Sequence, residues 1–190
     1  CIRDRHKLEI VPRLISEMLE YCNKMQTAAF WREKNYKSWF MALIKGIYVH
    51  SVEKDFTKPF KELLSRRIYK RPITIYDELR KNNLFDIRIK GEAGISIGVS
   101  HEMMNENYEQ ISGLYQLEPF GCMQECVAAS KIQSLIDITR SKEKVIHKRV
   151  IPYLTGVFGD SELSNLDAEM AMFAEKCRMR MNLEKKAKNK

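Results

Sequence analysis

Apolar residues recur along most of this chain every three to four positions, which is the spacing of an amphipathic helix. In residues 12–26 they share one helical face, and Pro12 suits a first helical turn. A second helix is predicted over residues 28–49. Its apolar stripe consists of Tyr36, Phe40, Leu43 and Ile47. Because such a stripe normally faces the interior, we expect these side chains to lie in the core.

Capping signals predict the next two helices. Thr57, two residues before a proline, begins a third helix. It ends at Arg71, because a residue before proline avoids the helical region. Thr74 caps a short fourth helix that runs to Arg80, and residues 81–83 form its exit.

Four further helices are predicted over residues 100–115, 123–139, 142–151 and from 164 onward. The buried stripe of the first consists of Met104, Tyr108, Ile111 and Tyr115. The inward side of the last consists of Leu166, Met170, Phe173 and Cys177. Segment 184–190 is polar and basic, so we expect it to be a frayed tail.

Apolar and other residues alternate in residues 85–90 and again in 95–99, with glycines between the two runs. A period of two on both sides of a glycine-bearing turn predicts a β-hairpin. An isolated hairpin is marginally stable in water, so its apolar face must rest on helices. The sequence therefore predicts a mainly α fold, in which residues 1–190 form a single helical domain of about seven helices with one β-hairpin inserted at about 85–99.

Composition narrows the class of protein. The 190 residues include 44% apolar and 31% charged residues, which are ordinary values for a globular core with a charged surface. Five cysteines are scattered and no secretory leader precedes them, so we expect free thiols in a reducing intracellular compartment, cytoplasmic or nuclear. No apolar run is long enough to cross a bilayer, and no membrane partner is expected. The chain begins with Cys1 rather than Met, so we expect a fragment of a longer polypeptide.

Charge is segregated along the chain, whose net charge is +8. Residues 91–130 contain six glutamates and no lysine or arginine, whereas residues 58–90 contain ten cations and four acids. Segregated charge shapes the electrostatic field and therefore the choice of partners. The candidate nucleic-acid contacts of this basic ridge are Lys58, Lys61, Arg66, Arg67, Tyr69, Lys70, Arg71, Arg80, Lys81, Arg88 and Lys90.

We expect the basic ridge to bind RNA or another polyanion. Cations neutralise phosphates and displace counterions, and Tyr69 offers a ring on which a base can stack. RNA is at least as good a candidate as DNA, because no helix-turn-helix, zinc-finger or basic-zipper pattern is present. The first hypothesis is a non-enzymatic module, without a cofactor, in a larger nucleic-acid-handling protein or replication assembly. A solvated helix face is the other interpretation of the same cations.

The second hypothesis is a helical scaffold that docks a protein partner, or other domains of the parent chain, through the acidic segment 91–130. Glu102, Glu106 and Glu109 share a helical face and are expected to point outward, where they can meet a basic surface. Trp31, which precedes an arginine, is a candidate interface anchor, since both residue types are frequent in binding hot spots.

No metal site is predicted. His101 begins a sequence that lacks the second histidine of the zinc-protease pattern, because Asn105 stands at that position. Cys122 and Cys126 are more widely spaced than the usual Cys-x2-Cys pair, and a second ligand pair is missing nearby.

No catalytic residue is predicted either. A metal-dependent nuclease that uses Asp77, Asp86 and Lys90 is a minor alternative. These residues do not have the acid-x-lysine spacing that such enzymes usually carry on a strand, so this hypothesis is the weakest of the three.

Overall fold

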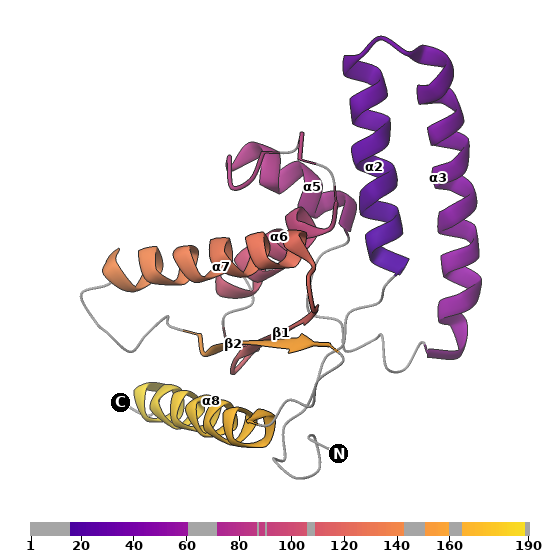
Figure 1. Ribbon diagram of the computed structural model, residues 1–190. Helices are drawn as coiled ribbons and strands as arrows, with labels where there is room; N and C mark the ends of the chain where they lie inside the picture. The colour runs from indigo at the N-terminus through magenta and orange to yellow at the C-terminus, as the bar shows by residue number, and fades with distance from the viewer. Residues whose placement is uncertain are drawn as a thin grey trace. The chain divides into compact units, whose positions relative to one another are not determined.

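The computed structural model describes residues 16–60, 72–86, 88–89, 91–105, 109–142, 151–159 and 165–188. Its helices are α2 (Ser16–Arg32), α3 (Tyr36–Thr57), the 3-10 helix η1 (Lys58–Phe60), α5 (Pro72–Lys81), α6 (Ala93–Asn105), α7 (Met123–Lys142) and α8 (Leu166–Lys188). Its strands are β1 (Leu114–Pro119) and β2 (Tyr153–Phe158) (Figure 1). The prediction of a mainly α fold with a small β element is confirmed. Most of the predicted third helix and of the predicted helix 142–151 lies outside the described residues.

The β element is not the predicted hairpin of residues 85–99. Helix α6 occupies the second expected arm, and its Ile95, Ile97 and Met103 are all buried. A helix that is enclosed on several sides loses the 3.6-residue pattern, so its alternating isoleucines resemble a strand. In the first expected arm, Arg88 donates from its backbone N–H and its guanidinium to the Asp86 carboxylate, which holds a turn.

The contacts divide the chain into two compact units, which we call the N-terminal unit (within Val11–Val99) and the C-terminal unit (within Ser100–Lys190). The prediction of a single domain stays a prediction. In the N-terminal unit, α2 and α3 lie side by side as an antiparallel helix hairpin (Figure 1). Asn35 begins α3 as its N-cap, because its side-chain oxygen accepts the backbone N–H of Ser38.

Helix α2 ends in a left-handed residue. Lys34 has a φ of 57°, its N–H donates to the Trp31 carbonyl, and the N–H of Asn35 donates to the Phe30 carbonyl. This pair of bonds is the Schellman motif, which normally carries glycine at the left-handed position. Helix α5 ends in the same way at Asn83, whose φ is 50°, so the predicted exit over residues 81–83 is confirmed.

Glycines of α6 form the centre of the N-terminal unit's core. A Cβ at position 94 would overlap the Tyr21 hydroxyl, and a Cβ at position 98 would overlap the Ile75 side chain. Tyr21, Ile75 and Leu79 are fully buried. The two glycines are one helical turn apart, so together they let α2 and α5 approach α6 closely.

The C-terminal unit is built on two parallel strands, in which Leu114 pairs with Tyr153 and Pro119 with Phe158. Helix α7 makes the crossover between them. Gln116 of β1 contacts Glu125 of α7, whereas its neighbour Tyr115 contacts α8. Because adjacent strand residues point to opposite faces, α7 and α8 cover opposite faces of the sheet, as Figure 1 shows. Tyr115 therefore lies on a strand, which corrects the helix predicted over 100–115.

Helix α8 packs with the side that the sequence predicted. Met170, Phe173 and Cys177 are buried together against Tyr115, Leu154 and Leu166. Tyr115 and Phe173 have ring centroids 6.2 Å apart. The helix continues to Lys188, into the segment that was expected to be a frayed tail.

Candidate functional site

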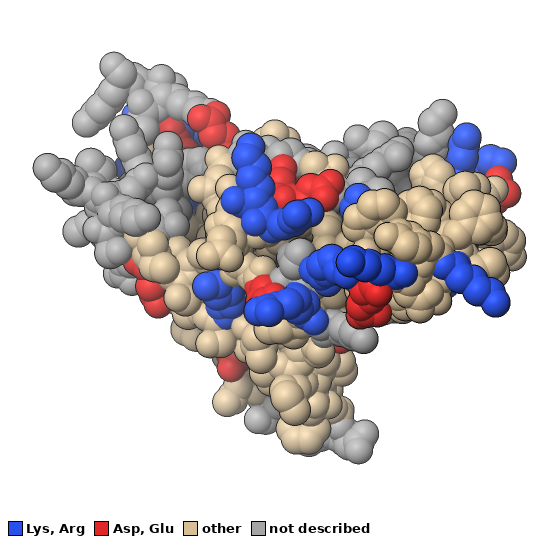
Figure 2. Space-filling view, turned by 90° about the horizontal axis from the view of Figure 1, so that it is seen from above, with Lys and Arg blue, Asp and Glu red and all other residues tan. Residues whose placement is uncertain are grey.

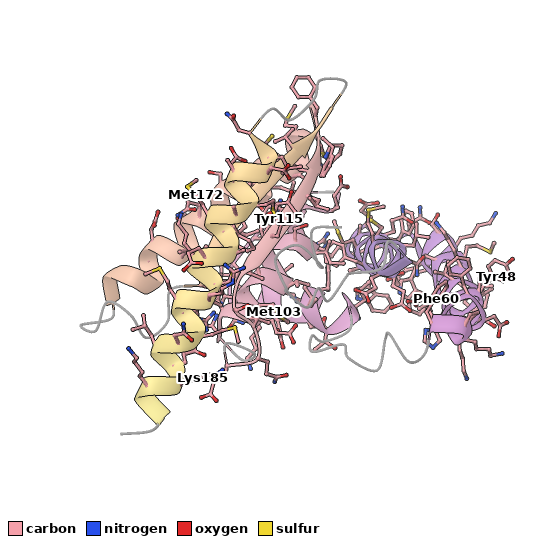
Figure 3. All side chains as sticks on the ribbon, turned by 90° about the horizontal axis from the view of Figure 1, so that it is seen from below. Tyr48, Phe60, Met103, Tyr115, Met172 and Lys185 are labelled. Atoms are coloured by element: carbon pink, nitrogen blue, oxygen red, sulfur yellow. The ribbon has the colours of Figure 1, made fainter. Side chains whose placement is uncertain are left out.

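The N-terminal unit exposes an extended apolar surface along α3. Nine large apolar side chains of this helix are each at least 38% exposed: Tyr36, Phe40, Met41, Leu43, Ile44, Ile47, Tyr48, Val52 and Phe56. We call these nine residues the α3 apolar face. Their spacing of three or four residues makes many of them surface neighbours. Tyr48 projects from the side of α3 that is turned away from α2 (Figure 3).

The opposite side of α3 packs on α2. Ala42 is buried there, and its carbonyl accepts a 3.2 Å hydrogen bond from Asn23 Nδ2. Gly46, one turn further on, also lies against Asn23. Near Asn23, the side of α3 that touches α2 therefore carries the small residues Ala42 and Gly46, while large apolar side chains of α3 are exposed.

The exposure of the α3 apolar face corrects an expectation from the sequence. The stripe of Tyr36, Phe40, Leu43 and Ile47 was expected in the core, but Ile47 is 74% exposed and the other three are exposed as well. The hydrophobic period identifies residues that share a face, but it does not say what covers that face. A helix that is apolar on its outer side is normally enclosed by other protein.

Trp31 extends this surface at the turn of the hairpin. Its ring centroid lies 5.2 Å from that of Trp39 and 5.8 Å from that of Tyr36. Trp31 is 56% exposed, so a large aromatic surface faces outward beside the first turn of α3. Its role as an interface anchor stays a prediction, and its position is continuous with the α3 apolar face.

Most of the predicted basic ridge falls outside the described residues, namely Lys61, Arg66, Arg67, Tyr69, Lys70, Arg71 and Lys90. Lys58, Arg80, Lys81 and Arg88 are described and exposed. Lys58 Nζ lies 2.6 Å from Asp55 Oδ1, and Arg88 pairs with Asp86, whose pKa its hydrogen bonds lower to about 2. Such exposed ion pairs contribute little free energy, so Lys58 and Arg88 remain able to bind a phosphate group instead.

Figure 2 shows the surroundings of the charged side chains on one face of the protein. Lysine and arginine side chains are interleaved there with aspartate and glutamate. Among the described cations of the basic ridge, Lys58 lies beside Asp55 and Arg88 lies beside Asp86. The densest part of the ridge, residues 61–71, lies outside the described residues.

The acidic segment is less exposed than predicted. Glu102 was expected to point outward, but it is only 2% exposed, because α6 is enclosed on that side as well. Glu118 and Glu125 are also buried. Glu109 is exposed, and Glu106 lies outside the described residues. The segment therefore offers less acidic surface than its composition suggests.

The buried acids Glu118 and Glu125 belong to a polar cluster between β1, β2 and α7. The Tyr153 hydroxyl donates to Gln116 Oε1 at 2.6 Å, and Gln116 Nε2 donates to Glu125 Oε2 at 2.6 Å. Burial raises the pKa of Tyr153, and the carboxylates of Glu118 and Glu125 raise it further. The cluster ties the sheet to α7, and we assign it a structural role.

Two of the three residues of the minor nuclease hypothesis, Asp77 and Asp86, pair with other side chains. Asp86 is bound by Arg88, and Asp77 lies 4.0 Å from Lys24 Nζ. Lys90 is outside the described residues. Cys122 is half-buried and Cys126 is exposed. In the described part of the chain, neither cysteine joins a group of three potential metal ligands.

A pocket of about 480 Å³ opens in the N-terminal unit and is lined by residues of α2 and by Glu33, Arg88 and Gly91. Met25, Ala29 and Phe30 form its apolar wall, and Arg32 and Arg88 bring guanidinium groups to it. Because Glu33 lines the pocket as well, charged groups of both signs face it and its lining does not select a ligand.

A group that the sequence reading missed lies between α2 and α3. Glu20, His50 and Glu53 bring one ligand atom each to within 4.8 Å of one another. The signal on α3 was a histidine and a glutamate three residues apart, which share a helix face. Glu20 is thirty residues away in the chain, so only the register of the helix hairpin reveals it.

Comparison with known proteins does not extend these observations. The chain matches no protein-family model, no curated protein and no solved structure. Among the helices of the described residues, none combines the length and the apolar character that a membrane span requires. The choice between the functional hypotheses therefore depends on the geometry of the surfaces.

Proposed function

We propose that this chain is a non-enzymatic assembly module whose α2–α3 hairpin docks onto an apolar surface of a partner protein. The observation that carries this proposal is the α3 apolar face, because large apolar side chains line the side of α3 that α2 leaves uncovered. This function is the scaffold hypothesis of the sequence analysis, with the α3 apolar face as the contact surface in place of the acidic segment 91–130.

The size of the face supports a protein partner. Side chains of this kind, about half exposed, each offer on the order of 100 Å². The summed exposed area of nine such side chains is larger than the largest apolar patch on a typical monomer, which is roughly 300–600 Å². This summed area is comparable with the roughly 800 Å² that each partner buries in a standard interface.

The charges around the face indicate the chemistry of the partner. Lys37, Lys45 and Lys54 of α3 are exposed beside the apolar side chains. An apolar groove or helix with acidic residues at its rim complements this pattern, because complementary rim charges steer association. We therefore expect association to slow as the salt concentration rises.

Site-specific photo-crosslinking tests the docking proposal. A benzophenone amino acid is placed at Phe40 and at Tyr48 in the full chain, and at Met172 of α8 as a control that is 59% exposed. We expect one protein to be trapped from both α3 positions and not from position 172. No product from the α3 positions would contradict the proposal.

Binding measurements on the trapped protein then test the face itself. Ile47→Asp should weaken binding at least tenfold, because it places a charge in the apolar contact. Met172→Asp adds the same charge outside the face and should leave binding unchanged. Sedimentation of the isolated chain over a concentration series distinguishes a second copy as the occupant, in which case the wild type dimerises and the Ile47→Asp variant does not.

Binding of RNA or another polyanion is the second candidate function. Its support is the exposure of Arg80 and Lys81 at the end of α5, which follows the cation-rich segment 61–71. Fluorescence anisotropy with labelled single-stranded RNA over a salt series tests it, since the slope of affinity against salt counts phosphate contacts. Replacing Arg66, Arg67, Lys70 and Arg71 by glutamate should abolish the signal without changing the circular-dichroism spectrum. Undiminished binding would reject this function.

A further inference from the structure

Three potential metal ligands meet between α2 and α3, at the end of the hairpin that lies far from its connecting turn. Glu20 comes from the first turns of α2, and His50 and Glu53 lie three residues apart on α3. In the described residues they form the one such group of three, with all ligand atoms within 4.8 Å of one another. His50 Nδ1 lies 3.0 Å from Glu20 Oε1.

The register of the helices explains why these side chains meet. Asn23 of α2 lies against Ala42 and Gly46 of α3. In an antiparallel pair, a step of one turn back along α2 corresponds to a step of one turn forward along α3. Glu20 therefore comes opposite the turn that begins at His50. The spacing of three residues puts Glu53 on the same side of α3 as His50.

The surroundings restrict Glu20 and leave His50 accessible. The Glu20 side chain is only 17% exposed, so packing restricts its rotamers. The His50 side chain is 53% exposed, so solvent and ions can reach the imidazole. Such a site has a positioned carboxylate at its base and an open outer side, where water can complete the coordination.

The donor set selects the kind of ion. Calcium and magnesium prefer sites made of oxygen ligands only. One imidazole nitrogen with two carboxylates suits divalent first-row transition metals such as Zn²⁺, Co²⁺ or Mn²⁺. Metal–ligand bonds of about 2.0–2.2 Å place two donors at most about 4.4 Å apart. Small side-chain rotations therefore bring all three atoms to bonding distance.

We propose that Glu20, His50 and Glu53 bind a divalent transition-metal ion that ties α2 to α3 at the open end of the hairpin. The ion takes the place of the His50–Glu20 contact and bridges the two helices directly. It neutralises two carboxylates that face each other across the hairpin. This inference rests on the ligand cluster alone and is independent of what the α3 apolar face binds.

Titration of the metal-free protein with CoCl₂ tests the site, because the visible absorption of cobalt reports its ligands. The variants are His50→Ala, Glu20→Gln and Glu53→Gln. Glu33→Gln is the matched control, since it removes the same charge from an exposed residue directly after α2. The cysteines are monitored in the same spectrum, because thiolate ligands add a strong near-ultraviolet charge-transfer band.

We expect one cobalt ion per chain with no thiolate band. His50→Ala and Glu20→Gln should each weaken binding at least tenfold, and Glu33→Gln should bind like the wild type. Wild-type affinity in His50→Ala, an equal loss in Glu33→Gln, a spectrum of thiolate ligation alone, or no binding would each overturn the site. Circular dichroism verifies folding, and if His50→Ala does not fold, Glu53→Gln decides by the same criterion.

Discussion

The hydroxyl of Tyr21 on α2 lies directly against Gly94 on α6, where a Cβ would occupy the same space. Tyr21 is fully buried, and its hydroxyl has no hydrogen-bond partner within the described residues. Burial raises the pKa of Tyr21 above its usual value of about 10. The contact therefore combines tight packing, which stabilises the N-terminal unit, with a buried polar group that costs free energy.

Removal of this hydroxyl is expected to stabilise the protein. Tyr21→Phe keeps the ring and its edge contact with Tyr76 while deleting an unsatisfied buried group. Leaving such a group unpaired costs about 1–3 kcal/mol, so we expect a gain of about 1 kcal/mol in the free energy of unfolding by urea denaturation. Tyr48→Phe is the control, because Tyr48 is 69% exposed and its hydroxyl is solvated. A loss of stability in Tyr21→Phe would show that the hydroxyl has a partner.

Addition of a methyl group on α6 is expected to destabilise the protein. Gly98→Ala drives a Cβ into the Ile75 side chain, and Leu79 lies close behind. Overpacking of a tight core typically costs about 1–3 kcal/mol, which exceeds the gain of helix propensity from glycine to alanine. Urea denaturation of Gly98→Ala should therefore show a lower midpoint. Ser51→Ala on the exposed side of α3 should leave the midpoint within experimental error.

Local signals predicted the parts of the fold that depend on local structure. The stripe of Met170, Phe173 and Cys177 was readable because α8 buries one side only. The exit of α5 was readable because asparagine tolerates the left-handed conformation that ends a helix. In both cases the pattern and the packing agree, since one face is buried and the other is solvated.

Tertiary contacts decided what the sequence did not predict. The sequence of α6 resembled a strand because the helix is buried on several sides. Only the close contacts of Gly94 with α2 and of Gly98 with α5 in the folded protein explain this burial. The α3 stripe had a helical period, but the period does not reveal that its side chains are exposed. The His50 and Glu53 pair was visible in the sequence, whereas Glu20 required the register of two helices.

The left-handed residue at the end of α2 offers a stabilising substitution. Lys34 has a φ of 57°, a conformation that costs a side-chain-bearing residue about 1 kcal/mol relative to glycine. Lys34→Gly should therefore raise the free energy of unfolding by roughly 0.5–1 kcal/mol. Lys45→Gly, in the middle of α3, should lower it by a similar amount, because glycine is unfavourable inside a helix. If both variants lose stability, Lys34 does not adopt the left-handed conformation in solution.

The hydrogen bond of Tyr153 predicts a specific response to alkaline pH. Its hydroxyl donates to Gln116, and burial with the nearby Glu118 and Glu125 raises its pKa above the value of about 10 of an unfolded tyrosine. Above that pH the unfolded chain releases a proton that the folded protein retains, so the free energy of unfolding falls as the pH rises.

Comparison of the wild type with Tyr153→Phe isolates this contribution. At pH 7 the variant should be less stable by about 1 kcal/mol, because it lacks the hydrogen bond to Gln116. As the pH rises above about 10, the wild type loses stability through Tyr153 and the variant does not, so the difference between them should shrink. Urea denaturation at several pH values between 7 and 11 measures both curves. Parallel curves would mean that Tyr153 titrates equally in the folded and unfolded states, and that the polar cluster beneath α7 does not retain its proton.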